Sequence, residues 1–294
     1  MPSAPQLLQY VISGTTVGST YGLTALGFTM IYNTTDIVNF AQGEFVMLGG
    51  MLAVFAMRWG HLPLPAAVLL SVVAVTALGV VVDRLTIRPV RSRSVLSLII
   101  ITVAVSILLR GGAMLLFGKD TFPLPPFTGG APVLLAGATV LPQNLWVLGI
   151  ALATLGSMKL FFDRTIVGKA MLACAFDAQA ASLMGIHVAG MVTLSFALSA
   201  LVGSLGGVIL APLTLTSYDA GVLLGLKGFA ACILGGLGNP FGAVAGGMLL
   251  GTLEALGAGL VSSGYKDALA FIILLALLFV RPSGLFGKKL GERV

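Results

Sequence analysis

The polar side chains best suited to chemistry lie between two apolar runs near the start of the chain. The linking sequence NTTDIVNFAQGE contains no Lys or Arg. Its amide and acidic residues are Asn33, Asp36, Asn39, Gln42 and Glu44. Such groups near a bilayer are costly unless they face water, a cavity or a neighbouring helix. The link is therefore either a solvated turn or a broken helix that lines a solute route with its backbone exposed to water.

Two further charged residues, Lys227 and Glu254, stand inside apolar segments. One interpretation is a buried structural pair or a helix-end contact. The other is that these groups line the route taken by a substrate. Glu254 therefore joins the five polar residues of the link as a candidate for the substrate pathway.

The sequence contains no pattern typical of an enzyme. It lacks the phosphate-binding GxxxxGK[ST], the zinc-binding HExxH and the GxSxG nucleophile elbow. His61 and His187 lie at predicted segment boundaries, where histidine ordinarily makes local hydrogen bonds. Cys174 and Cys232 are too few and too far apart to predict a disulfide or a metal site. We expect neither catalysis, nor a metal, nor a cofactor in this chain.

The composition is that of a membrane protein with many spanning segments. Of 294 residues, 57% are hydrophobic and only 9% are charged, whereas a soluble domain carries about 25% charge. The 39 glycines fit closely packed membrane helices. We expect one all-α domain over residues 1–294, with about eight or nine membrane helices and no signal peptide, because the first basic residue is Arg58.

Nine apolar segments are long enough, or nearly so, to cross a bilayer, which takes about 20 residues. They are Leu7–Tyr32, a segment from the link to Arg58, Pro65–Val82, Val95–Phe117, Gln143–Phe162, Val188–Leu210, Val222–Gly238, Phe241–Leu260 and Asp267–Val280. The stretch Gly118–Pro142 is rich in Pro and Gly and predicts an extracytoplasmic loop. Paired glycines four residues apart, such as Gly247 and Gly251, predict close helix packing.

A short helix is predicted in the polar loop 163–187. The run from Lys169 to Met184 contains no Gly, Pro or β-branched residue and is dominated by Ala, which favours helix. Gly168 precedes the run, and Gly185 follows it, where a terminating glycine belongs. A single stiff helix of 16 residues would be about 24 Å long.

The basic residues predict how the chain lies in the membrane. Three loops, 83–94, 159–169 and 281–294, hold 11 of the 16 Lys and Arg residues, leaving five elsewhere. Because cytoplasmic loops carry an excess of Lys and Arg, these loops and the C-terminus are expected in the cytoplasm. The net charge of +6 is explained by this asymmetry, so no nucleic-acid partner is predicted.

Several of these segments resemble one transporter family. GSTYGLTALGFTMIYNTTDIVNFAQGEFVMLGG, from Gly18, is similar to the opening of the H-type inner-membrane permease of branched-chain amino acid ABC importers. GKAMLACAFDAQAASLMGI, from Gly168, resembles the cytoplasmic coupling segment of that family. Its QAASLMG part is similar to the EAA-x-x-x-G element of bacterial importer permeases, with Gln179 in place of the usual Glu. FAACILGGLGNPFGAVAGGMLLGTLE and RPSGLFGKK add to the likeness.

The resemblance implies a permease in the bacterial inner membrane that forms half of a channel. Its expected partners are a second related permease, two cytoplasmic ATPases that bind ATP and Mg²⁺, and a periplasmic or extracellular substrate-binding protein. The coupling segment would engage an ATPase and act as a rigid lever. Matching the family motif, its contact residues would be Gly168, Lys169, Asp177, Gln179, Ala180, Ala181 and Gly185.

Two other classes of transporter remain open from the residues alone. An ion-coupled secondary transporter usually has acidic groups or broken helices at mid-membrane, and Glu254 would be its acid. A passive channel would need a ring of filter residues from an oligomer. The resemblance implies a branched-chain amino acid as substrate, although relatives carry urea, amides and other amino or carboxylic acids.

Overall fold

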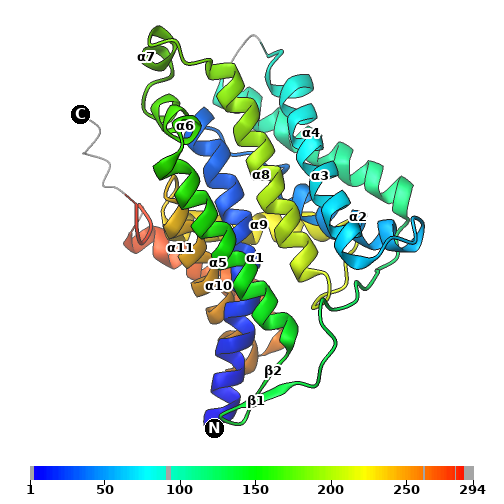
Figure 1. Ribbon diagram of the computed structural model, residues 1–294. Coiled ribbons are helices and arrows are strands. Elements are labelled where there is room, and N and C mark those ends of the chain that lie inside the picture. Colours follow the sequence, from blue (N-terminus) through cyan, green and yellow to red (C-terminus); the bar gives the residue numbers. More distant parts are fainter. Residues whose placement is uncertain (1–2, 91–93, 261, 282, 288–294) are drawn as a thin grey trace.

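The computed structural model describes residues 3–90, 94–260, 262–281 and 283–287. These residues form a bundle of α-helices with one small β-hairpin (Figure 1). The expected all-α polytopic fold is confirmed. The basic residues Arg91, Arg93, Lys288, Lys289 and Arg293, on which part of the orientation argument depends, lie outside the described residues.

Each of the nine predicted apolar segments contains one helix. These are α1 (Ala4–Thr35), α2 (Gln42–Arg58), α3 (Leu64–Val82), α4 (Val95–Phe117), α5 (Pro142–Arg164), α8 (Val188–Leu210), α9 (Ala220–Gly235), α10 (Pro240–Leu260) and α11 (Lys266–Val280). Among the described residues, six helices are long and apolar enough to cross a membrane. Of the remaining three, α1 is rich in Thr and Gly, while α2 and α9 have 17 and 16 residues. The number of spans is therefore not confirmed as eight or nine.

The Thr- and Gly-rich α1 lies inside the bundle, whereas the strongly apolar α4 lies on its outside. On α1, most residues from Thr16 to Ile31 are buried, among them five Thr or Ser side chains. By contrast, α4 exposes large aliphatic side chains such as Leu108 and Leu115, which are 71% and 83% exposed. Lipid accepts such side chains, whereas hydroxyl groups need partners within the protein.

Glycines bring the central helices into backbone contact, as predicted. On α10, Gly247 and Gly251 lie against Gly18 of α1, where an added Cβ would overlap backbone atoms of the other helix. Another pair of glycines four residues apart on α10, Gly242 and Gly246, packs in the same way against α9. Small residues therefore set the spacing of these helices.

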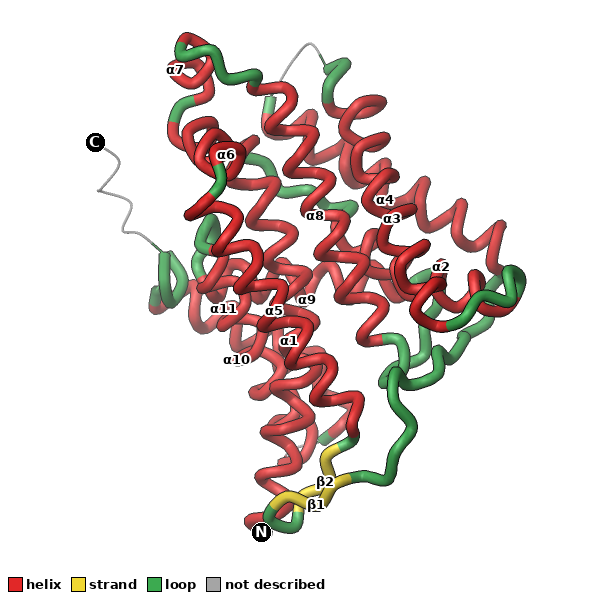
Figure 2. Tube along the Cα trace, in the orientation of Figure 1, coloured by secondary structure: helices red, strands yellow, loops and turns green. Residues whose placement is uncertain are grey.

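The loop between α4 and α5 contains no helix, as expected from its prolines and glycines, but includes a hairpin that was not predicted. Strand β1 (Val133–Leu135) pairs antiparallel with β2 (Ala138–Val140). Ala136 and Gly137 between them have φ values of 49° and 83°, the backbone twist that suits a two-residue hairpin turn. The hairpin lies beside the N-terminus, at the end of the bundle opposite α6 and α7 (Figure 2).

The prediction of one stiff helix from Lys169 to Met184 is wrong. The segment forms α6 (Ile166–Phe176) and α7 (Ala178–Leu183), separated at Asp177, whose backbone is extended. The Asp177 carboxylate accepts hydrogen bonds from the amides of Gln179 and Ala180, at 2.8 and 2.9 Å. An acidic side chain that caps a new helix in this way competes with continuation of the old one. Gly168 lies inside α6 against α5, while Gly185 ends α7 with a φ of 85°.

The basic loop after α3 also contains more structure than expected. Residues Asp83–Ile87 continue α3 as one turn of π-helix. The buried Asp83 carboxylate accepts a hydrogen bond of 2.5 Å from the hydroxyl of Thr193 on α8. This contact fixes the end of α3 against α8.

Candidate functional site

The polar link is a break between two helices, and α2 begins inside the bundle. α1 ends at Thr35, and Asp36 then adopts a left-handed conformation with a φ of 54°. The chain turns back, so that Gln42 packs against Gly27 of α1. Gly27 lies eight residues before Thr35, or about 12 Å along the helix. A solvated turn is therefore excluded for this inner part of the link.

The inner residues of the link are fully buried among other helices. Asn39, Gln42 and Glu44 are each at most 1% exposed. The Gln42 amide donates to the carbonyl oxygen of Ser199 on α8, at 3.2 Å, and accepts from the Ser199 hydroxyl. The hydroxyl of Ser106 on α4 donates to Glu44 at 2.8 Å.

Two polar atoms of the link are buried without a hydrogen-bond partner in the described part of the chain. They are Nδ2 of Asn39 and Oε2 of Glu44. The Glu44 carboxylate occupies the space beside Gly221 of α9 that a Cβ atom would need. Buried polar groups are usually paired, so unpaired ones at a helix break are candidates for contact with a solute or water.

The outer residues of the link lie apart from this buried group. The Asn33 side chain donates to the carbonyl oxygen of Gly238 at 3.0 Å, which ties α1 to the turn between α9 and α10. Asp36 is exposed at the end of α1. The structure therefore buries Asn39, Gln42 and Glu44, with Gln42 against α1 and α8 and Glu44 against α4 and α9, but does not bury Asn33 or Asp36.

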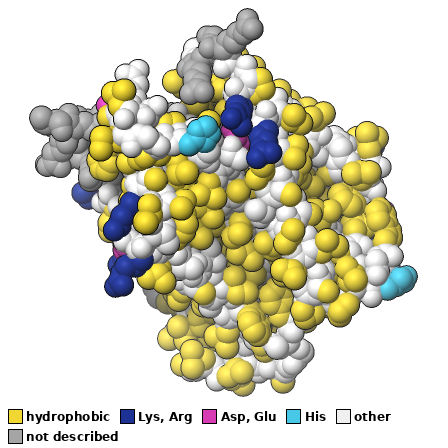
Figure 3. All heavy atoms as spheres, turned by 45° about the horizontal axis from the view of Figure 1, so that its top comes forward, with side chains coloured by type: hydrophobic (Ala, Val, Ile, Leu, Met, Phe, Trp, Pro, Cys, Tyr) yellow, Lys and Arg dark blue, Asp and Glu magenta, His cyan; other side chains and the backbone are white. Residues whose placement is uncertain are grey.

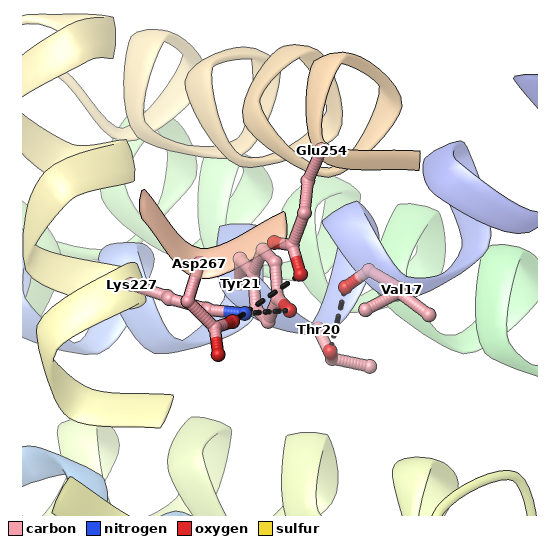
Figure 4. A network of polar contacts seen from close by, with 6 residues as sticks. All are labelled: Val17, Thr20, Tyr21, Lys227, Glu254 and Asp267. Atoms are coloured by element: carbon pink, nitrogen blue, oxygen red, sulfur yellow. Dashed lines mark hydrogen bonds and ion pairs between the residues drawn. The ribbon is translucent and has the colours of Figure 1, made fainter. Parts of the chain in front are cut away.

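Glu254 belongs to a separate cluster around Lys227, shown in Figure 4. The Lys227 ammonium lies 2.7 Å from the Glu254 carboxylate and 2.6 Å from that of Asp267. It also donates to the Tyr21 hydroxyl at 3.2 Å. Lys227 and Glu254 are 2% and 7% exposed. The ion pair that the sequence left as one alternative is thus present, and the cluster joins α1, α9, α10 and α11.

Sequence reasoning missed Asp267 as a partner of Lys227. It begins the last predicted segment, where an acidic residue is ordinary because a helix N-terminus favours negative charge. Only the packing of α11 against α9 and α10 brings its carboxylate to Lys227.

The segment 163–187, for which a coupling role was predicted, lies at the end of the bundle opposite the hairpin and exposes large apolar side chains. Phe176, Leu183 and Met184 are 85%, 89% and 84% exposed; we call these three residues the apolar tip. Of the predicted contact residues, Gly168 and Ala181 are buried, whereas Lys169, Asp177, Gln179, Ala180 and Gly185 are exposed. Figure 3, which turns this end forward, shows Lys and Arg side chains on it amid a mostly hydrophobic surface.

The apolar tip was not predicted, although its signal is present in the sequence. Phe176 directly precedes the capping residue Asp177, and Leu183 and Met184 precede the terminating Gly185. A residue at a helix end does not have to pack against a neighbouring helix. An apolar side chain at such a position can therefore remain available to bind another protein.

Comparison with known proteins gives consistent matches along the chain. A family model described as "Branched-chain amino acid transport system / permease component" matches residues 10–278. The high-affinity branched-chain amino acid transport system permease protein BraD of Pseudomonas aeruginosa is 33% identical over 307 residues, covering 100% of both chains. The corresponding protein LivH of Escherichia coli is 32% identical, covering 98% of this chain and 97% of that protein.

More distant matches extend the comparison. A probable branched-chain amino acid transport permease protein LivH of Methanocaldococcus jannaschii is 29% identical over 90% of this chain and 88% of that protein. The solved structure of PsaBC from Streptococcus pneumoniae in complex with Fab has a TM-score of 0.51 and 17% identity, covering 95% of this chain and 92% of that chain. At this identity the likeness shows the fold alone.

Proposed function

The chain belongs to the family of branched-chain amino acid transport permease components, and we propose that it pairs with a second, related permease to form the channel of its importer. It is a permease subunit of an ABC importer and part of a multi-subunit transport system. Two ATPases bind at its cytoplasmic end, and a soluble substrate-binding protein docks at the other. ATP and Mg²⁺ are bound by the ATPases.

The proposed substrate is a branched-chain amino acid or a related small polar solute such as another amino acid, an amide or urea. The printed names of the relatives BraD and LivH support the first of these. We assign the inner half of the pathway to Asn39, Gln42 and Glu44. Asn33, Asp36 and Glu254 remain candidates at other depths.

The observation that carries the partner assignment is the apolar tip. Large apolar side chains that are exposed outside the membrane mark a site of contact with another protein. The tip lies on a segment that the family uses for coupling, at an end with exposed basic side chains. An ATPase covers the tip, so this end of the bundle faces the cytoplasm of a bacterial inner membrane; the basic residues of the sequence support the same side for the C-terminus.

The break at Asp177 changes how this coupling works. α6 packs closely on α5 through Gly168, so it moves with the membrane helices. α7 follows a single extended residue and carries Leu183 of the tip. ATPase closure therefore acts first on α7, and the Asp177 cap determines how firmly that motion passes to α6.

A gentle-detergent pull-down of the tagged chain from its native membrane tests this function. Two ATPase subunits and a second permease are expected, together with uptake of branched-chain amino acid that stops when ATP is removed. Uptake that persists in the presence of an uncoupler at constant ATP separates the importer from an ion-coupled transporter. Purification without any ATPase, or uptake without ATP, would refute the proposal.

A further inference from the structure

α4 lies parallel to α2 and to the end of the polar link, in one constant register. Three contacts join the two stretches: an amide that donates to a hydroxyl at 3.3 Å, a hydroxyl that donates to a carboxylate at 2.8 Å, and two stacked rings with centroids 4.6 Å apart. The pairs are Phe40 with Thr102, Glu44 with Ser106, and Phe55 with Phe117. In each pair the residue of α4 stands 62 positions after its partner. Two stretches that keep one offset over this length run side by side in the same direction.

A third polar residue follows the two hydroxyls on the same face of α4. Thr102, Ser106 and Arg110 are spaced four residues apart, which places them above one another on a helix. Arg110 is half-buried in a segment that is apolar enough to cross a membrane. Its charge acts on the Glu44 carboxylate, but among the described residues no carboxylate lies within ion-pair distance of it. An arginine inside a membrane span is costly unless it has a partner.

The four-residue spacing permits a second register between α4 and the link. A slide of α4 by four residues toward its N-terminus, or about 6 Å, would bring Arg110 opposite Glu44. The same slide would bring Ser106 opposite the Phe40 amide. Both groups of the link would then keep a partner, because one hydroxyl replaces another and a cation replaces a hydroxyl at the carboxylate. A slide in the other direction would set Leu98 against the Phe40 amide and leave that donor unpaired.

The surroundings of α4 leave it free to slide. It lies on the outside of the bundle (Figure 1) and packs mainly on α2 and on the π-helical turn Asp83–Ile87. Where Gly111 and Gly112 would carry a Cβ, no other atom of the described chain lies within 4 Å. Phe122, just beyond α4, already contacts the ring of Phe55 with centroids 4.9 Å apart. An aromatic ring therefore stays beside Phe55 in either register.

The start of α4 is connected to the segment 163–187. This segment ends where α8 begins, and Thr193 in the second turn of α8 donates a hydrogen bond to the buried Asp83. The π-helical turn that contains Asp83 packs on α4. Movement of α7 therefore reaches α4 through Thr193 and Asp83.

We propose that Arg110 is a second partner of Glu44: during the transport cycle α4 slides one turn along α2, and an ion pair between Glu44 and Arg110 replaces the hydrogen bond between Glu44 and Ser106. This inference rests on the proposed importer function and makes Arg110 a positioning residue for transport. In the register of the structure, the Glu44 charge is held by a hydroxyl; in the second register it is neutralised. Because each register has its own polar partners, the helix has two discrete positions rather than a continuous range.

Cysteine cross-linking of the assembled importer in native membranes tests the slide, in a chain whose two native cysteines are replaced by Ala. Met51 and Ala113 are 62 positions apart and belong to one apolar cluster, as does Met47, one turn before Met51. A short bifunctional methanethiosulfonate should link Met51→Cys with Ala113→Cys in one register and Met47→Cys with Ala113→Cys in the other. When ATP and vanadate arrest the ATPases, the two yields should change severalfold in opposite directions. The control pair, Thr15→Cys with Thr252→Cys between α1 and α10, should keep a constant yield. Yields of the two α2–α4 pairs that do not change would overturn the slide.

Charge substitutions at Arg110 test the ion pair independently of the cross-links. Arg110→Gln should lower ATP-dependent uptake by about tenfold with the ATPases still bound, whereas Arg110→Lys should retain most of it. Because Glu44→Gln removes the same pair, the double variant Glu44→Gln with Arg110→Gln should be no slower than either single variant. Arg58→Gln, an exposed change at the end of α2, is the matched control and should transport normally.

Two results would overturn the pairing. One is normal uptake by Arg110→Gln, and the other is a double variant in which the two losses multiply. Uptake by the unmodified chain that needs no ATP would instead refute the importer function, whatever the cross-links show.

Discussion

The Lys227 cluster and the apolar tip are opposite exceptions to the rule that charged side chains are exposed to water and large apolar side chains are buried. The cluster buries charge inside an apolar bundle, whereas the tip exposes Phe176, Leu183 and Met184 outside it. Lys227 finds two carboxylates and a hydroxyl within its own chain. The tip has no such cover in the described structure. The Lys227 charge is therefore balanced within the chain, whereas the apolar tip requires a second protein.

The polar link stands between these two cases. Glu44 is as buried as Lys227, but it has no ion-pair partner among the described residues, whereas Lys227 has two. A buried charge that is balanced by a neighbouring ion predicts a role in stability, and a buried charge without such a partner predicts a role in function. The following variants separate these contributions, beginning with the largest expected effect.

Replacing Lys227 with Met should destabilise the chain strongly. The substitution leaves Glu254 and Asp267 without their cation, and loss of one partner of a buried pair typically costs about 3 kcal/mol or more. Thermal unfolding of the purified complex in detergent measures the effect. The double variant Lys227→Met with Glu254→Gln should recover part of the loss. A wild-type unfolding temperature for the single variant would mean that the cluster does not hold the helices together.

Replacing Leu183 and Met184 with Ser should leave unfolding unchanged but weaken ATPase binding. Truncating an apolar interface residue costs about 1 kcal/mol, so the two changes together should lower the affinity by roughly thirtyfold. Co-purification at increasing ATPase concentration gives the value. The control Leu108→Ser changes an exposed Leu on α4, outside the apolar tip, and should bind normally. If ATPase binding survives in the double variant, the tip is not the docking surface.

Replacing Glu44 with Gln should lower uptake while the ATPases remain bound. Gln keeps an acceptor for Ser106 but removes the charge, and a lost polar contact of about 1.4 kcal/mol corresponds to roughly tenfold in rate. Initial uptake rates in membrane vesicles provide the measurement. Asp163→Asn, an exposed change outside the pathway, is the matched control. Normal uptake by Glu44→Gln would return the link to a purely structural role.

Replacing Asp177 with Ala should have the smallest effect and act only on α7. Loss of a helix cap costs about 1 kcal/mol, or about fivefold faster local opening. Hydrogen exchange at the amides of Gln179 and Ala180 should report it. Asp177→Asn retains a capping oxygen and should exchange at the wild-type rate. If these amides exchange at the wild-type rate in Asp177→Ala, the Asp177 cap does not control the opening of α7.

Sequence reasoning predicted the long apolar helices best, because their boundaries are set locally. The predicted ends of α4 and α8 agree to the residue. Long apolar runs bounded by polar or helix-ending residues need no information about neighbours. The close packing through Gly247 and Gly251 was predicted for the same reason.

Features that depend on distant contacts were not predictable. The link could be recognised as polar, but its return alongside Gly27 depends on how α1, α2 and α8 pack. Asp267 could not be paired with Lys227 before α11 was placed. The break at Asp177 is different, because its cap is local. Helix propensity over the Ala-rich run outweighed one capping residue in the prediction, and the side-chain hydrogen bond prevailed in the structure.

The pairing of α1 with α10 has a consequence for biogenesis. The hydroxyls of Thr15 and Thr252 lie 3.2 Å apart although they are 237 residues apart in the chain. At the usual speed of translation, α1 leaves the ribosome roughly 10 to 50 s before this partner exists. During that interval its buried hydroxyls and glycines have no α10 to cover them, and α1 is less apolar than the six clear spans. The first helix to be made is therefore among the last to be completed, and the insertion machinery has to shelter it meanwhile.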